Sequence, residues 1–130
     1  MSVLTKALRW PIISLLITGG LHFTAEAIWP DLRTAFIAPT LAPLLLVYGL
    51  WVGYRVVGLG GTYGHAILGA AILGVLPIAL DVVGFGIVLD RGVEAGTLAG
   101  VFGFLVIMFG SLIGSGVALS HEPQNPGRAG

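Results

Sequence analysis

The chain has 130 residues, of which 56% are hydrophobic and 9% are charged, with a mean hydropathy of +1.00 and a formal net charge of zero. Soluble domains carry about 25% charged residues, so this composition excludes an ordinary soluble fold and indicates that lipid covers much of the surface. The lack of cysteine excludes disulfides and thiolate sites, and the few basic residues argue against nucleic-acid binding.

Four apolar segments, separated by short polar breaks, are each long enough to cross a bilayer as a helix, which takes about 20 residues. They cover approximately residues 10–29, 34–57, 65–89 and 96–120. Membrane-spanning strands would be about half as long and would alternate in polarity. The sequence therefore predicts an all-α fold, with residues 1–120 as one antiparallel bundle of four transmembrane helices. Residues 121–130, rich in proline and glycine, are predicted to form a cytoplasmic tail.

The first segment resembles a signal peptide in outline, because Lys6 and Arg9 precede it and Ala25-Glu26-Ala27 has small residues at cleavage-site spacing. Pro11, however, suits the first turn of a helix, where its missing N–H costs little. We expect this segment to be retained as a membrane span.

The second segment carries Thr40 near its outer end and aromatic residues towards its other end. The aromatic residues are Tyr48, Trp51 and Tyr54, and Arg55 follows them. Aromatic rings and long cationic side chains gather where a membrane meets water. We interpret this group as an anchor at the cytoplasmic interface.

The glycine-rich loop at residues 58–64 lacks the last glycine of the phosphate-binding pattern and follows a membrane helix, so we interpret it as a turn.

The third segment carries Asp81 among apolar residues, with no positive neighbour in sequence. A carboxylate at this depth needs a partner, a proton or water, and acids inside membrane helices are functional-site candidates by default. Pro77 lies one turn before Asp81 on the same stripe of the helix, together with several small residues. This proline can kink the helix.

The fourth segment has a regular row of glycines: Gly96, Gly100, Gly103, Gly110 and Gly114. Helices in lipid associate through close packing, and glycines allow their backbones to approach. The row predicts a tight helix contact. Whether that contact lies within one chain or between subunits is open at this point.

The rise of an α-helix places His22 and Asp81 at similar depth, roughly 10 Å inside the outer boundary. We expect them on antiparallel helices in the outer half of the bundle. The predicted polar pocket, or proton or ion pathway, comprises His22, Glu26, Asp81, Thr40 and Arg33, with Arg33 folding back towards Glu26. A histidine beside a carboxylate can pass a proton in the physiological range. The alternatives are a buried pair that fixes helix register, and an interfacial, snorkelling role for Glu26.

No cofactor and no metal are predicted. Helical spacing brings only His22 and Glu26 of the candidate metal ligands onto one face. His65 lies at the opposite end of the bundle from His22, so one haem within a chain cannot take both. A haem between subunits and a quinone site in the outer half of the bundle remain open.

We expect a non-enzymatic integral membrane protein that acts in a homo-oligomer, or as an accessory subunit of a larger membrane complex. The alternative is a small proton-, ion- or solute-transporting channel or transporter that uses the Asp/His/Glu cluster. The partners expected are the lipid bilayer and other membrane subunits, without nucleic acid.

The expected location is the bacterial inner (plasma) membrane, with both termini in the cytoplasm. Basic residues favour the cytoplasmic side of a membrane protein. This orientation places Lys6, Arg9, Arg55 and Arg128 inside, and Arg33 and Arg91 outside.

Overall fold

The computed structural model describes residues 2–29, 38–88 and 92–121. Its elements are α1 (Val3–Ile28), α2 (Ala38–Gly58), α3 (Tyr63–Leu80), the π-helix η2 (Asp81–Val88) and α4 (Val93–His121). No strand occurs in these described ranges. Because η2 continues α3, there are four helical rods, each long and apolar enough to span a membrane. The prediction of an all-α, four-helix membrane bundle is confirmed.

Helices α1, α3 and α4 begin earlier than the predicted spans. The side chain of Ser2 accepts a hydrogen bond from the Thr5 amide at 3.2 Å, which caps α1 and starts it at Val3. Pro11 therefore lies more than two turns inside α1, and its expected place in the first turn is wrong. At the turn between α2 and α3, Gly60 has φ +93°, a conformation that favours glycine, and Thr62 caps α3.

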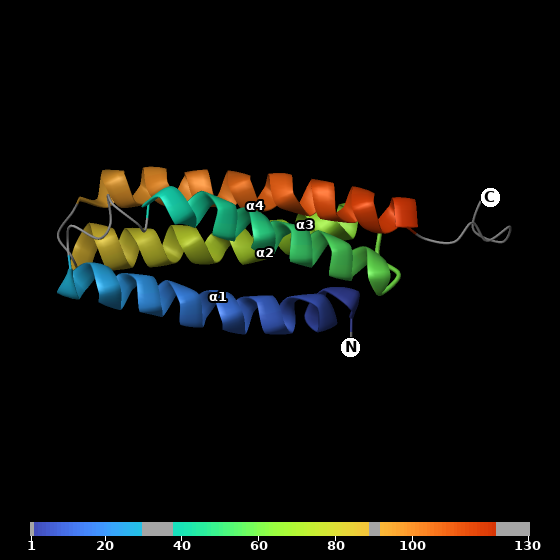
Figure 1. The fold of residues 1–130 in the computed structure, drawn as a ribbon, viewed down its shortest axis with the longest axis horizontal. Coiled ribbons are helices and arrows are strands. Elements are labelled where there is room, and N and C mark those ends of the chain that lie inside the picture. Colours follow the sequence, from blue (N-terminus) through green and yellow to red (C-terminus); the bar gives the residue numbers. More distant parts are fainter. Residues whose placement is uncertain (1, 30–37, 89–91, 122–130) are drawn as a thin grey trace, which may run out of the picture.

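The four rods form three layers (Figure 1). The middle layer contains α2 and α3, with α4 packed on one side of it and α1 on the other. Successive helices alternate in direction, so α1 and α3 run parallel. His22 lies on α1 and Asp81 at the end of the α3 rod, so the expectation that they lie on antiparallel helices is wrong. Helix α2 runs in the opposite direction between them in the chain.

The closest helix contact joins α2 to α4 through glycines on both helices. These are Gly49 and Gly53 on α2, and Gly110 and Gly114 on α4. A Cβ atom placed on Gly110 would lie 2.5 Å from the carbonyl oxygen of Leu46, and one on Gly53 would overlap the carbonyl of Ser111. The two backbones thus touch directly, which is how glycines promote helix association in lipid.

The remaining glycines of the row bring α4 against α3 and η2. A Cβ atom on Gly96 would lie 2.5 Å from the Asp81 carbonyl oxygen, and one on Gly100 would lie 2.5 Å from Ile78 Cα. Gly103 lies between the side chains of α2 and α3. The structure therefore places all five glycines of the predicted row in contacts within one chain.

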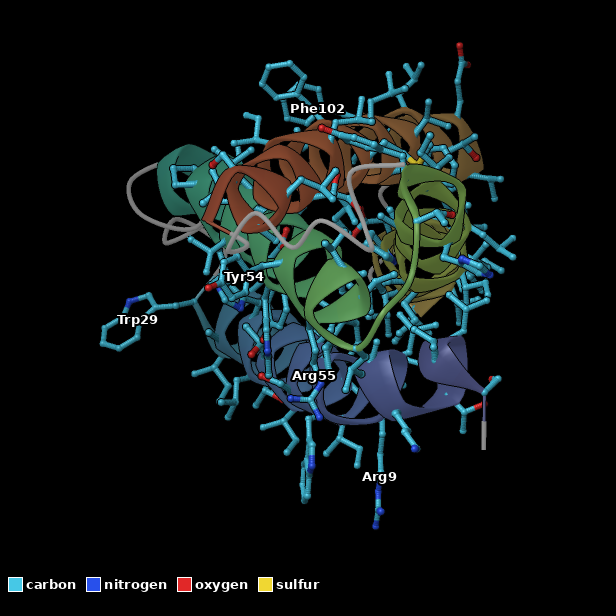
Figure 2. All side chains as sticks on the ribbon, turned by 90° about the vertical axis from the view of Figure 1, so that its right-hand side faces the viewer. Arg9, Trp29, Tyr54, Arg55 and Phe102 are labelled. Atoms are coloured by element: carbon cyan, nitrogen blue, oxygen red, sulfur yellow. The ribbon has the colours of Figure 1, made fainter. Side chains whose placement is uncertain are left out.

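Helix α1 is the least buried of the four. In its most apolar stretch 17% of the residues are buried, against 39% in each of the other three. Its first half packs well, through Ala7, Leu8, Pro11 and Leu15. Arg55 lies between α1 and α2 (Figure 2) and donates from Nε to the Lys6 carbonyl at 3.4 Å. The second half of α1 exposes Ile17 and Leu21, so this part of the bundle is loosely covered.

We predict that Gly53→Ala lowers the stability of the protein in detergent, because its methyl group would meet the backbone of α4. Overpacking of this kind costs about 1 to 3 kcal/mol. The matched control is Gly20→Ala, since no atom lies within 4 Å of the added methyl group there. Thermal unfolding should show a lower midpoint than wild type for Gly53→Ala, and no such decrease for Gly20→Ala. Equal midpoints would contradict the glycine-mediated contact.

Candidate functional site

The helix that carries Asp81 changes its winding at this residue. Pro77 has no N–H, so the carbonyl one turn earlier loses its usual donor. The Asp81 N–H donates to the carbonyls of both Pro77 and Ile78, and the chain continues as the π-helix η2. The predicted span at 65–89 is thus not a uniform α-helix. π-helical turns are rare and occur frequently at functional sites.

Asp81 is buried, with 8% of its surface exposed. Its backbone lies against Gly96 of α4, which holds the start of η2 in place. Asp81 also lines a cavity of about 520 Å³ between α1, α2 and the α3–η2 rod. The acid is thus part of an internal site within the membrane-spanning region.

The cavity is predominantly apolar. Leucines from α1, α2 and α3 make up much of its wall, and the polar side chains among its described lining residues are Thr18, His22 and Asp81. Leu16 on α1 and Val83 on η2 are exposed while also lining the cavity. The cavity therefore opens on the flank of the bundle that α1 and the α3–η2 rod form.

Two reciprocal contacts hold α1 against the α3–η2 rod beside the cavity. Leu80 packs onto Gly19, where a Cβ atom would lie 2.7 Å from Leu80 Cδ1. Phe23 packs onto Gly84, where a Cβ atom would lie 3.0 Å from the ring. Each helix thus offers one large and one small residue, and these pairs fix the side of α1 that faces Asp81.

A polar stripe runs along α1 at intervals of four residues: Ser14, Thr18, His22 and Glu26. The hydroxyl of Tyr48 on α2 lies 2.7 Å from Ser14 Oγ and 2.9 Å from Thr18 Oγ1. Thr18 Oγ1 also bonds to the Ser14 carbonyl at 2.9 Å. These hydroxyl groups form a connected chain between α1 and α2.

The interfacial role predicted for Tyr48 is wrong. Tyr48 is 5% exposed, whereas Trp51 and Tyr54 of the same predicted group are exposed. The inward position follows from helical spacing, because Tyr48 shares a face with the buried Leu45 and Val52. This spacing can be read from the sequence, and it could have predicted that Tyr48 faces inward.

The imidazole of His22 has a defined tautomer when neutral. Its Nδ1 lies 2.8 Å from the Thr18 carbonyl oxygen. A carbonyl oxygen can only accept, so Nδ1 carries the proton and donates it to this bond. The second nitrogen, Nε2, is therefore the one that can gain or lose a proton.

The structure brings together two of the predicted polar residues, since His22 and Asp81 line the same cavity. Glu26 is not among the residues that line it. Its exposed fraction is 1%, so the Glu26 side chain does not snorkel to the surface as the alternative expected. Arg33 and the side chain of Thr40 lie outside the described part of the structure.

The other candidate ligands lie apart from this cavity. His65 Nδ1 accepts a hydrogen bond from the Thr62 amide at 3.2 Å and completes the cap of α3, at the opposite end of that helix from Asp81. Among the residues that the structure describes, no group of three or more His, Asp or Glu side chains could hold a metal ion.

Comparison of the chain with protein-family models, with curated protein sequences and with solved structures finds no match. The cavity and its polar groups are therefore the basis for the functional inference.

We predict that Tyr48→Phe destabilises the protein by about 1 kcal/mol, the usual net contribution of a buried hydrogen bond. The change removes the hydroxyl that joins Ser14 and Thr18 across the two helices. The control is Tyr54→Phe, because Tyr54 is 52% exposed. Denaturant titration in detergent should separate the two variants. A Tyr48→Phe protein as stable as the control would show that the hydroxyl chain contributes nothing to helix docking.

Proposed function

We propose that this chain is a small, non-enzymatic membrane transport protein that moves protons through the cavity between α1, α2 and α3. The observation that supports this proposal best is that His22 and Asp81 line one cavity. Ionisable residues inside membrane spans are rare and commonly mark proton or substrate pathways.

The proton-handling role follows from the chemistry of the two groups. Asp81 can hold a proton as a carboxylic acid or release it as a carboxylate. His22 keeps Nδ1–H on the Thr18 carbonyl, so Nε2 can exchange protons with the cavity while the ring stays oriented. The cavity wall thus carries two groups that can exchange protons, in otherwise apolar surroundings.

The hydroxyl chain extends this polar path along α1. Thr18 lines the cavity, and its hydroxyl bonds to Tyr48, which in turn bonds to Ser14. Hydroxyl groups both donate and accept, so each can pass a proton to the next. We propose that these three residues form a polar path beside His22, which reaches the cavity through Thr18.

We predict that a potassium diffusion potential drives proton movement into liposomes that contain the protein, and that Asp81→Asn abolishes it. An internal pH-sensitive dye measures the rate. His22→Gln should slow the movement by roughly a hundredfold or more, since one relay group is lost from a general acid–base pathway.

The control for these variants is Glu94→Gln, which makes the same acid-to-amide change at an exposed residue of α4 outside the cavity. It should behave as wild type. Undiminished proton movement in a folded Asp81→Asn protein would overturn the proposed function.

We also propose that both termini lie in the cytoplasm, at the inner membrane of a bacterium. The N-terminus of α1 and the end of α4 lie at the same end of the bundle (Figure 1). Lys6, Arg9 and Arg55 belong to that end, and basic residues favour the cytoplasmic side.

A second proposal is that the chain works as a homo-oligomer or as a subunit of a larger membrane complex. The low burial of α1 supports it, because a partner could cover the exposed second half of this helix. The glycine row does not support it, since those glycines contact helices of the same chain.

We predict that purification in a mild detergent recovers a stable assembly larger than one chain. Light scattering coupled to gel filtration measures its mass, and mass spectrometry identifies any other subunit. A single chain free of partners would exclude the second proposal and leave the transport proposal unaffected.

A further inference from the structure

We propose that the end of the bundle where α1 begins binds the headgroup of an anionic phospholipid, through Lys6 and Arg9 of α1 and Arg55 of α2. The ligand class is a phosphate diester that carries one net negative charge at the membrane surface. None of these three residues is among the described residues that line the cavity, so the inference does not depend on the proposed transport.

The three cations come together from two neighbouring helices. Lys6 and Arg9 are three residues apart on α1 and therefore share a face of that helix. Arg55 lies in the last turn of α2 and donates from Nε to the carbonyl oxygen of Lys6 at 3.4 Å. Figure 2, which views the bundle from this end, shows Arg55 beside α1 and Arg9 extending outward from the same helix. The Arg55 guanidinium is thus anchored to the backbone of the helix that carries the other two cations.

The charge at this end is positive. All lysine and arginine side chains in the described ranges belong to it, whereas the described acidic side chains lie in the other half of the bundle. These acids are Glu26 near the end of α1, Asp81 at the start of η2 and Glu94 in the first turn of α4. Like charges one turn apart on a helix repel, and a third cation held beside them adds to the repulsion. A bound anion relieves it.

The hydrogen-bond donors of this end suit a phosphate group. The Arg55 guanidinium has five N–H groups, so its bond to the Lys6 carbonyl leaves most of them for another acceptor. The Arg9 guanidinium lies 5.4 Å from the centroid of the Trp10 ring, a contact that uses the ring face rather than an acceptor atom. The Lys6 ammonium is exposed and adds further donors. Guanidinium and ammonium groups are the usual partners of phosphate oxygens in proteins.

The side of α1 that carries the cations continues as an apolar surface. Beyond the cations it presents Trp10, Ile13 and Ile17 at intervals of three and four residues, and all three are exposed. This stripe has charge at the end of the helix, then an aromatic ring, then aliphatic side chains inside the membrane span. A phospholipid has the same order of headgroup, interface and acyl chain. A soluble anion would use the cations alone, so the stripe favours a lipid.

A phosphate held here also links two helices. Helix α1 is the least buried of the four, and the cations that bind the headgroup belong to α1 and α2. A ligand that binds only the folded protein stabilises it. The lipid therefore strengthens the docking of α1 on the rest of the bundle.

Tryptophan fluorescence tests this inference, because bromine atoms on lipid acyl chains quench a nearby indole. Replacing Trp29 and Trp51 by Phe leaves Trp10, on the stripe beside the cations, as the single tryptophan. This protein is reconstituted in phosphatidylcholine bilayers that contain brominated phosphatidylglycerol or brominated phosphatidylcholine. One cation near an anionic headgroup gives roughly a fivefold preference. Half-maximal quenching should therefore need a mole fraction of the brominated anionic lipid that is at least about tenfold lower.

Arg55→Gln in the same background should reduce this preference by roughly fivefold. The matched control is Arg91→Gln, which removes one positive charge from the chain segment between η2 and α4 and should leave the preference unchanged. Equal quenching by the two brominated lipids, or an effect of Arg91→Gln as large as that of Arg55→Gln, would overturn the inference.

A second measurement uses the unmodified protein in detergent. Phosphatidylglycerol added to the micelles should raise the midpoint of thermal unfolding above that in phosphatidylcholine, whereas millimolar inorganic phosphate should not. An equal rise with inorganic phosphate would indicate a site for soluble anions and overturn the lipid assignment, and equal midpoints in the two lipids would overturn the site itself. This comparison needs no variant, so it decides the question even where a substituted protein does not fold.

Discussion

Helices in lipid associate through close packing, and in this protein glycines allow α4 to touch the backbones of both α2 and α3. Gly110 and Gly114 meet α2, while Gly96 and Gly100 meet the α3–η2 rod. This contact joins three of the four rods into one unit. It also places Asp81, because the backbone of that residue lies directly against Gly96. The position of the acid therefore depends on the same packing that holds the bundle together.

Helix α1 docks on this unit by a different mechanism, which explains the cavity. Its first half is buried against α2 and α3, whereas its second half is held at a few points. Those points are the packing of Leu80 on Gly19, the packing of Phe23 on Gly84, and the hydroxyl bonds of Tyr48. The space left between the points of contact is the cavity, and the polar stripe of α1 supplies Thr18 and His22 to its wall.

The local geometry at Asp81 links the fold to its proposed chemistry. Pro77 interrupts the regular hydrogen bonds of α3, and the chain continues from Asp81 as a π-helix. A buried acid, a histidine with one nitrogen fixed by hydrogen bonding and an apolar wall then meet at one place. The proposed proton pathway draws on this combination.

The sequence by itself determined the four membrane-spanning helices, because their length and hydropathy leave no other stable way to satisfy backbone hydrogen bonds in lipid. Helical rise also placed His22 and Asp81 at similar depth, and the glycine row predicted a tight contact. Only the tertiary structure decided which helices those glycines meet, that Tyr48 faces inward, and that Glu26 lies outside the cavity wall. The physical reason is that periodicity describes one helix at a time. The rotation and neighbours of each helix are set by side chains on other helices, which are distant in the chain.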